Sequence, residues 1–228
     1  KKYRKQHELF IAEGAKVIQE LINSNYELVN VFVTENISTE VIGAKRIEIT
    51  ASDLEKITAL KTANNCLAVF KIPSEKTYST EGLLVALDDV RDPGNLGTIL
   101  RLCDWFGITN LICSEDTVDI YNPKVVQATM GSIARVNVSY VNLPQFLQSY
   151  THPIFGTFMD GENIYKDKLP NQGIIVMGNE ANGISAEIEN LCTRRIAIPR
   201  FGNLQVTESL NVATATAIIL SEFKRSDV

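Results

Sequence analysis

Histidine is scarce in this chain, which has two histidines among its 228 residues. His7 and His152 stand far in the sequence from the glycine-rich and proline-containing motifs described below. A mechanism in which histidine serves as the general base or as part of a catalytic triad therefore has little support. The sequence also has no histidine cluster and no carboxylate pair typical of a metal site, so we expect an activity that needs no metal.

Cysteine is uncommon as well, and its positions exclude the usual metal-binding patterns. The four cysteines are widely spaced in apolar segments, at Cys66, Cys103, Cys113 and Cys192. We therefore expect buried free thiols. No apolar run reaches the length of a membrane span and no signal peptide is evident, so we expect a cytoplasmic protein with no membrane contact. The Gly-x-Gly-x-x-Gly spacing is also absent, which argues against a nicotinamide-binding oxidoreductase.

Excess positive charge is another missing feature. The net charge is -5, so the chain has no general field that would attract polyanions, and any contact with nucleic acid must be a local patch. The first residues, Lys-Lys-Tyr-Arg-Lys, form the most basic local segment. Arg4 and Lys5 are therefore candidate nucleic-acid-binding residues, together with the first part of the chain that carries them.

Residues 1–73 predict a small α/β domain. Short apolar runs predict strands at residues 9–12, 29–33, 46–49 and 67–70. Val17, Ile18, Leu21 and Ile22 share one face of an amphipathic helix, and Ser52 with Glu55 predicts a capping box at the start of another. Residues 74–80 are polar and are predicted to be a linker.

Residues 81–228 alternate strand and helix. Apolar runs predict strands at residues 82–87, 108–113, 136–141, 154–158, 173–177 and 195–198, with helices at about 95–106, 123–131 and 144–150 between the first of them. This order predicts a mostly parallel sheet with helices on both faces. The run at 173–177 is apolar throughout, as expected of a strand that is covered on both sides.

Three loops in this second part are candidate functional sites. The first reads Asp-Pro-Gly-Asn-Leu-Gly at residues 92–97 and is followed by Arg101. The second is the glycine-rich loop at residues 178–183, which offers backbone N–H groups and the carboxylate of Glu180. The third runs from residue 200 to Ser209 and Asn211. Each has a plainer interpretation when taken alone: a turn that starts a helix, a strand-to-helix connection with a solvated carboxylate, and two helix caps.

The three loops together, in this order, resemble the motifs of a known family. DDVRDPGNLGTILR, IIVMGNEANGIS and IAIPRFGNLQVTESLNVATA are similar to the first, second and third motifs of the SpoU (TrmH-type) RNA ribose 2′-O-methyltransferases of the SPOUT superfamily. The first 73 residues resemble the substrate-binding domain of that family. The third loop departs from the family pattern, because the stretch between Pro199 and Ser209 is longer than usual.

The resemblance implies a fold, a cofactor and an assembly. The fold would be α/β, with a C-terminal deep trefoil knot that is a rare exception to unknotted topology, preceded by the small α/β substrate-binding domain. The knot loops would bind S-adenosylmethionine, without a metal, and two subunits would pair as a homodimer through the knotted domain. The donor pocket would include Thr157, Gly178, Ile198 and Leu210.

The resemblance also implies the catalytic residues and the substrate. The motif residues match Asn95, Arg101, Glu180, Ser209 and Asn211. The activity would be methyl transfer to a ribose 2′-hydroxyl of RNA and not of DNA, with ribosomal RNA favoured over transfer RNA by analogy. We expect Arg101 to contact the target ribose or its phosphate, because a guanidinium is a poor general base. The alternative is a catalytically silent RNA-binding dimer with the same fold.

Overall fold

The computed structural model describes residues 2–24, 26–34, 46–74, 77–166, 168–202 and 209–225. Its internal contacts divide the chain into two compact units. Unit 1 comprises Lys1–Glu75 together with Asp119–Arg135, and unit 2 comprises Lys76–Val118 together with Val136–Val228. The segment at 119–135, which the strand–helix alternation assigned to the second domain, therefore packs with the first unit. The domain limits at residues 73 and 81 stay a prediction of the sequence.

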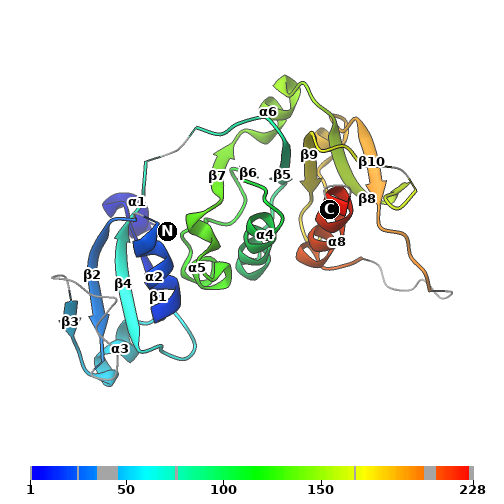
Figure 1. The fold of residues 1–228 in the computed structure, drawn as a ribbon. Coiled ribbons are helices and arrows are strands. Elements are labelled where there is room, and N and C mark those ends of the chain that lie inside the picture. The colour runs from blue at the N-terminus through cyan, green and yellow to red at the C-terminus, as the bar shows by residue number, and fades with distance from the viewer. Residues whose placement is uncertain are drawn as a thin grey trace. The chain divides into compact units, whose positions relative to one another are not determined.

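Unit 1 is built on a four-stranded mixed sheet with the strand order β1-β4-β2-β3 (Figure 1). These strands are Leu9–Glu13, Cys66–Lys71, Leu28–Val33 and Arg46–Glu48. Strand β4 is antiparallel to both β1 and β2, and β3 is parallel to β2. The unit also contains the helices α1 (Lys2–His7), α2 (Ala15–Asn23), α3 (Ala51–Ile57) and α5 (Pro123–Thr129), and the 3-10 helix η2 (Ser132–Ala134).

Unit 2 contains a six-stranded sheet with the order β10-β8-β9-β5-β6-β7, in which every neighbouring pair is parallel (Figure 1). In that order the strands are Arg194–Ala197, Ile154–Asn163, Gly173–Met177, Leu83–Leu87, Asn110–Ser114 and Asn137–Val141. The helices are α4 (Pro93–Trp105), α6 (Leu143–Ser149), α7 (Ala186–Glu189) and α8 (Val212–Lys224). The parallel α/β class predicted from the sequence is confirmed.

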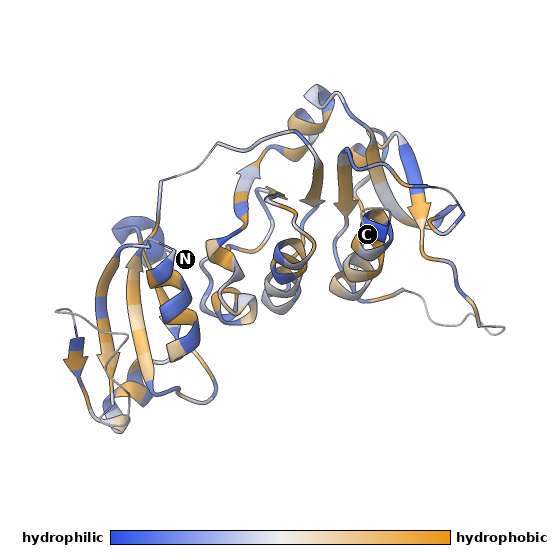
Figure 2. Ribbon diagram, viewed as in Figure 1, coloured by the Kyte–Doolittle hydropathy of each residue, from blue (hydrophilic) through white to orange (hydrophobic). Residues whose placement is uncertain are grey.

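Helices cover both faces of this sheet. Every residue of the central strands β5 and β9 is buried, and both strands carry the colours of apolar residues in Figure 2. Alternate residues of β5 and β9, such as Leu84 and Ile174, form one core cluster with Phe146 of α6 and Ile188 of α7. On α8, Phe223 packs its ring edge-on against Phe155 of β8, with ring centroids 5.1 Å apart, and α8 also contacts α4. The sheet is therefore the middle layer of three.

Four elements differ from the prediction, for identifiable reasons. Helix α4 begins at Pro93 and not at residue 95, because the Asp92 side chain accepts a hydrogen bond from the Asn95 N–H and caps it. Helix α3 is capped by Thr50, so the predicted cap at Ser52 is wrong. Helix α1 was not predicted, because it lacks an apolar face, and no residue in it is buried. Strand β8 continues to Asn163, because its polar second half pairs with β10.

Two further expectations concern buried free thiols and membrane-spanning segments. Cys66, Cys103 and Cys113 are buried free thiols, and Cys192 is free and half-buried. Among the residues described, no helix has the length and apolar character needed to cross a membrane.

Candidate functional site

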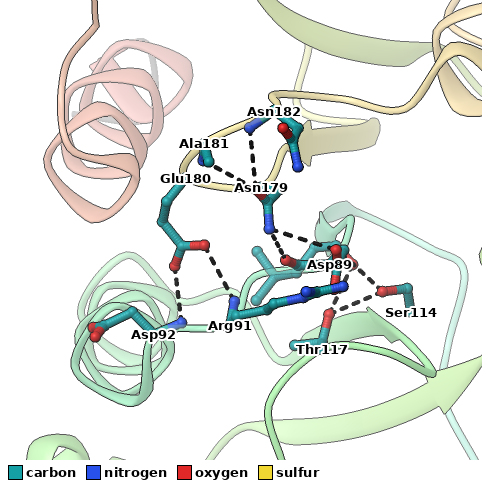
Figure 3. A network of polar contacts seen from close by, with 10 residues as sticks. Asp89, Arg91, Asp92, Ser114, Thr117, Asn179, Glu180, Ala181 and Asn182 are labelled. Atoms are coloured by element: carbon teal, nitrogen blue, oxygen red, sulfur yellow. Dashed lines mark hydrogen bonds and ion pairs between the residues drawn. The ribbon is translucent and has the colours of Figure 1, made fainter.

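The candidate site lies at the carboxyl ends of strands β5 and β9. These strands are adjacent and parallel, with Leu87 paired to Met177, so the loops that follow them leave the sheet at the same edge. The loop after β5 enters helix α4, and the loop after β9 carries Glu180 (Figure 3). Parallel α/β sheets bind ligands at such carboxyl edges. The topology therefore brings together two motifs that are about 85 residues apart.

Glu180 connects the second motif to the first. Its Oε2 atom accepts a hydrogen bond from the backbone N–H of Arg91 at 3.2 Å, and Oε1 accepts one from the N–H of Asp92 at 3.1 Å (Figure 3). The same Oε1 atom accepts a third bond from Nδ2 of Asn95 at 2.9 Å. The carboxylate thus faces the N-terminal end of α4 and the two residues just before it, where a helix favours negative charge.

These hydrogen bonds determine the protonation state of Glu180. Partial burial raises the pKa of its carboxyl group, but the bonds donated by Asn95 and by the N–H groups of Arg91 and Asp92 outweigh that effect, and the net pKa lies below its ordinary value. The side chain is therefore an anion at neutral pH. Glu180 already accepts three hydrogen bonds and has a depressed pKa, so it positions the groups around it and is a weak proton acceptor.

Asn211 joins the third motif to the same chain of contacts. Its Nδ2 atom donates to Oδ1 of Asn95 at 2.9 Å. Its own Oδ1 accepts hydrogen bonds from the N–H groups of Ala213 and Thr214, so Asn211 is also the N-cap of α8. One continuous line of hydrogen bonds thus runs from Glu180 through Asn95 to Asn211. It contains one side chain from each of the three motifs.

A second set of contacts, which sequence reasoning missed, shapes the loop that carries Glu180 (Figure 3). Nδ2 of Asn179 donates to the backbone oxygen of Asp89 at 2.6 Å, and its Oδ1 accepts from the N–H groups of Ala181 and Asn182. Asp89 has a φ of +56°, in the left-handed region, and its N–H donates to Ser114 Oγ at 2.9 Å. Asparagine and aspartate tolerate such turn conformations, and this is the sequence signal that could have found Asn179 and Asp89.

Gly178 lies where two parts of the same loop touch. A Cβ atom at this position would lie 2.3 Å from both the carbonyl carbon of Gly183 and the nitrogen of Ile184. Asn179 and Gly183 close the loop with two backbone hydrogen bonds of 2.9 Å each. The loop is therefore a closed turn in which a side chain at Gly178 has no room.

Arg101 and Ser209 are placed near the motif elements but outside the line of hydrogen bonds. Arg101 is exposed on α4, six residues after Asn95, and Ser209 is exposed two residues before Asn211. Within the residues that the structure describes, no hydrogen bond or ion pair to either side chain is found. The lengthened loop of the third motif lies partly at residues 203–208, outside the described ranges.

Three of the four residues expected at the donor pocket follow a strand or precede a helix: Gly178 follows β9, Ile198 follows β10, and Leu210 lies just before α8. Thr157 instead lies within β8, and its hydroxyl donates to the backbone oxygen of Val176 at 2.9 Å. Ile198 follows β10 directly and is half-buried, and Leu210 is 48% exposed. With Gly178, these residues carry no positive charge. An uncharged, partly apolar set of side chains suits a cationic sulfonium donor with a purine ring.

The two predicted RNA-binding residues of unit 1 differ in their surroundings. Lys5 is exposed on α1. Arg4 is half-buried and donates through Nη2 to Oδ2 of Asp119 at 2.9 Å and through Nε to the same oxygen at 3.2 Å. The described residues contain no group of three histidine, cysteine, aspartate or glutamate side chains placed to hold a metal ion.

Two family models match the chain over separate parts. Residues 82–221 match the SpoU rRNA Methylase family, and residues 1–68 match a domain described as the MRM3-like substrate binding domain. Together they cover most of the chain.

Individual relatives agree with this assignment. The chain is 27% identical, over 96% of its length and 90% of the other protein, to the 23S rRNA (guanosine(2553)-2′-O)-methyltransferase RlmP of Bacillus subtilis. It is 34% identical, over 67% of its length and 62% of the other protein, to the 23S rRNA (guanosine-2′-O-)-methyltransferase RlmB of Neisseria meningitidis.

Solved structures resemble the whole chain. A putative RNA methyltransferase of the TrmH family from Porphyromonas gingivalis matches with a TM-score of 0.87 and 38% identity, over 99% of this chain and 93% of that one. The AdoMet-bound rRNA methyltransferase from Sinorhizobium meliloti matches with a TM-score of 0.86 and 27% identity, over 100% and 91%. With the three motifs joined at one edge of a parallel sheet, this chain belongs to the SpoU rRNA methylase family.

Proposed function

We propose that this protein transfers a methyl group from S-adenosylmethionine to a ribose 2′-hydroxyl of ribosomal RNA. The observation that carries the proposal is the line of hydrogen bonds from Glu180 through Asn95 to Asn211, because it unites the three family motifs at a sheet edge suited to a ligand. Ribosomal RNA is favoured over transfer RNA because the relatives named above act on 23S rRNA. Cytoplasmic location stays a prediction of the sequence.

The donor would be held by Thr157, Gly178, Ile198 and Leu210, which are themselves uncharged. When bound, S-adenosylmethionine supplies an electrophilic methyl group on a positively charged sulfur. The protein's own task is to hold the ribose hydroxyl in line with that methyl group at contact distance, since the hydroxyl is a weak nucleophile. The closed turn around Gly178 gives the loop one defined shape for this purpose.

Arg101 is proposed to bind the phosphate or the ribose of the target nucleotide. Its side chain is exposed, and among the described residues it has no polar partner, so its donors are available to the RNA. A guanidinium stays protonated in proteins and has no lone pair with which to accept a proton. Arg101 would therefore position the nucleotide and stabilise the negative charge that develops on the 2′-oxygen.

The remaining motif residues are proposed to fix the positions of Arg101 and of the loops around it. Glu180 and Asn95 order the first turn of α4, the helix that carries Arg101, and Asn211 ties that turn to α8. Ser209 is exposed just before Asn211, and we propose that its hydroxyl faces the bound ligands. Arg4 and Lys5 are kept as candidate RNA contacts of unit 1.

We also propose that the C-terminal segment is knotted and that two copies pair through unit 2. The first proposal rests on the family assignment. Within this segment β8 and β10 pair side by side with a shift in register at Arg195/Ile196, and a Cβ atom on Gly161 of β8 would lie 2.5 to 2.7 Å from the backbone of Ile196 in β10. Where backbones pass this closely, only glycine fits. Analytical ultracentrifugation of the purified protein tests the pairing, for which a single monomeric species would be the contrary result.

The function is tested with the variant Arg101→Ala. We expect it to bind S-adenosylmethionine with the affinity of the wild type, measured by calorimetric titration, and to lose methyl transfer to unmodified 23S rRNA transcript. Full activity of Arg101→Ala would remove Arg101 from the mechanism. A folded wild-type protein that binds RNA but not the donor would instead support the alternative of a catalytically silent RNA-binding dimer.

A further inference from the structure

The loop at residues 178–185, between β9 and α7, is attached to the end of β5 at two places. Near its start, Nδ2 of Asn179 donates to the backbone oxygen of Asp89 at 2.6 Å (Figure 3). Near its end, the backbone N–H of Ser185 donates to Oδ2 of Asp88 at 2.7 Å. The two aspartates are consecutive and directly follow β5. They therefore hold both ends of a loop that lies 90 and 97 residues further along the chain.

The acceptor of the Asn179 bond, the backbone oxygen of Asp89, has a direction that its surroundings fix. Asp89 has a φ of +56°, in the left-handed region that is costly for a residue other than glycine. Its N–H donates to Ser114 Oγ at 2.9 Å, and this hydroxyl lies 3.0 Å from Oγ1 of Thr117. Thr117 is buried, and its hydroxyl donates to the backbone oxygen of Leu87 at 3.3 Å. The loop after β6, the other neighbour of β5, thus supports the strained conformation.

The two ends of the Asn179 amide make different kinds of contact. Its Oδ1 atom accepts hydrogen bonds from the N–H groups of Ala181 and Asn182, at 2.9 and 3.1 Å, and so orders the turn within the loop. Its Nδ2 atom makes the bond that leaves the loop and crosses to Asp89. Replacing this amide with a carboxylate would therefore remove the crossing bond and keep the acceptor of the turn.

The crossing bond affects Glu180, the next residue in the loop. Arg91 and Asp92, whose N–H groups donate to the Glu180 carboxylate, stand two and three residues after Asp89. One short segment thus binds Asn179 at its start and Glu180 at its end. The two bonds to Glu180 are 3.2 and 3.1 Å long, at the upper end of the usual range, so a small shift of the loop would break them.

We propose that Asn179 and Asp88 are positioning residues for methyl transfer, because they fasten the two ends of the loop that presents the Glu180 carboxylate to α4. The inference rests on the proposed function and extends it to two residues that have no assigned contact with the donor or the RNA. Asn179 acts through Glu180, which orders the start of the helix that carries Arg101, and Asp88 holds the far end of the same loop. The site then depends on three adjacent strand ends, those of β9, β5 and β6.

The geometry is tested by amide hydrogen exchange of the isotope-labelled full chain, followed residue by residue by NMR. In Asn179→Asp, the N–H groups of Arg91 and Asp92 should exchange faster than in the wild type. Their rates should approach those in Glu180→Ala, in which the acceptor of both groups is absent. The two N–H groups that donate to Oδ1 of residue 179 should stay protected, because aspartate still offers them an oxygen. This pattern distinguishes the loss of one bond from a general loosening of the loop.

The role in catalysis is tested by methyl transfer to unmodified 23S rRNA transcript. Asn179→Asp should lower kcat on the order of 10- to 100-fold, as a small misplacement of catalytic groups does. Its calorimetric affinity for S-adenosylmethionine should equal that of the wild type, because the closed turn around Gly178 is kept. Adding Glu180→Gln should cause little further loss, since both changes remove the same arrangement. The matched control is Asn190→Asp, at an exposed residue just after α7 whose side chain has no hydrogen bond to the described residues.

The second attachment is tested with two variants of Asp88. Asp88→Ala removes the acceptor of the Ser185 N–H and should lower kcat, whereas Asp88→Asn keeps an oxygen in that place and should recover most of the loss. Because Asp88 is buried, urea unfolding is measured for each variant, and rates are compared at a temperature at which all of them are fully folded. An equal loss of rate in both variants would exclude the Ser185 bond as its cause.

The possible outcomes separate this inference from the proposed function. If Arg91 and Asp92 exchange at wild-type rates in Asn179→Asp, the inference is wrong and the function stands. If their exchange rises but kcat does not fall, Asn179 only shapes the loop, and the inference is again wrong. If donor affinity falls as far as kcat, Asn179 acts on donor binding and not through Glu180. If exchange changes as expected but the wild type neither binds the donor nor methylates RNA, the attachment of Glu180 is confirmed and the proposed function fails.

Discussion

The substitution Gly178→Ala tests the geometry of the candidate site most directly. The new methyl group would lie 2.3 Å from the backbone of Gly183 and of Ile184, and 2.6 Å from the Gly183 carbonyl oxygen. Ordinary contact begins at 3.4 Å, so one side of the turn has to move by about 1.1 Å. The obstructing atoms belong to the backbone, and no side-chain rotation relieves the overlap.

A movement of this size would lengthen the hydrogen bonds that define the site. The two backbone bonds between Asn179 and Gly183 are 2.9 Å long, and the three bonds to Glu180 lie between 2.9 and 3.2 Å. A displacement of about 1 Å breaks bonds of this length, because hydrogen bonds weaken beyond about 3.2 Å. Forcing a methyl group into such a tight place costs about 1–3 kcal/mol in the free energy of unfolding. Misplacing catalytic groups by about 1 Å costs on the order of 100-fold in rate.

We therefore expect Gly178→Ala to unfold at a lower urea concentration than the wild type, to bind S-adenosylmethionine more weakly and to transfer methyl groups about 100-fold more slowly. Urea unfolding followed by circular dichroism, calorimetric titration and a tritiated methyl-transfer assay measure these three quantities. The matched control is Gly202→Ala, because a Cβ atom at Gly202 would meet nothing within 4 Å. Wild-type stability of Gly178→Ala would refute the steric reasoning. Reduced stability with unchanged donor binding would remove Gly178 from the donor pocket.

Three further predictions concern single side chains. Asn211→Ala should lower the free energy of unfolding by about 0.5–2 kcal/mol through loss of the α8 cap, as measured by urea unfolding. Asn211→Asp should restore this stability but not methyl transfer, because a carboxylate cannot donate to Asn95; an active Asn211→Asp enzyme would contradict this. The folded-state pKa of Glu180 is depressed below the usual 4.5, so its contribution to stability is full above about pH 4.5 and declines as the pH falls through the folded pKa. The stability difference between wild type and Glu180→Gln should therefore shrink below that pH, and a difference that grows on acidification would reverse the assignment. Burial raises the pKa of Cys103 to about 12 and that of half-buried Cys192 to about 11, so we expect Cys192 to react first with a thiol reagent at pH 8 and Cys103 only after unfolding, as mass spectrometry of the labelled protein would show.

The parts of the fold that depend on local apolar patterns were predictable. The run at 173–177 coincides with strand β9, since a strand buried on both faces must be apolar throughout. Caps were predictable where one candidate stood alone, as at Asn122 before Pro123. Thr50 and Ser52 both lie three residues before an acidic side chain, so the capping pattern does not distinguish them. The prediction took Ser52, whereas Thr50 is the residue that caps the helix.

The remaining features depend on contacts between distant segments. Helix α1 has no apolar periodicity, and its ion pair joins Arg4 to Asp119, which is 115 residues away. The packing of residues 119–135 with unit 1 has the same non-local origin. At the candidate site, the sequence provided Asn95, Glu180 and Asn211 through a family resemblance, but the hydrogen bonds between them follow from the pairing of β5 with β9 and from the cap of α8.

The line of hydrogen bonds through the three motifs also has a direction. Glu180, as a carboxylate, can only accept, so Asn95 must turn its NH2 group toward Glu180 and its oxygen toward Asn211. Asn211 must in turn donate to Asn95, which leaves its oxygen for the N–H groups of α8. One anion thus sets the orientation of two amides and orders the first turns of two helices. Because the three side chains orient one another, replacing any one of them should leave the other two wrongly oriented, with double-mutant effects smaller than the sum of the single ones.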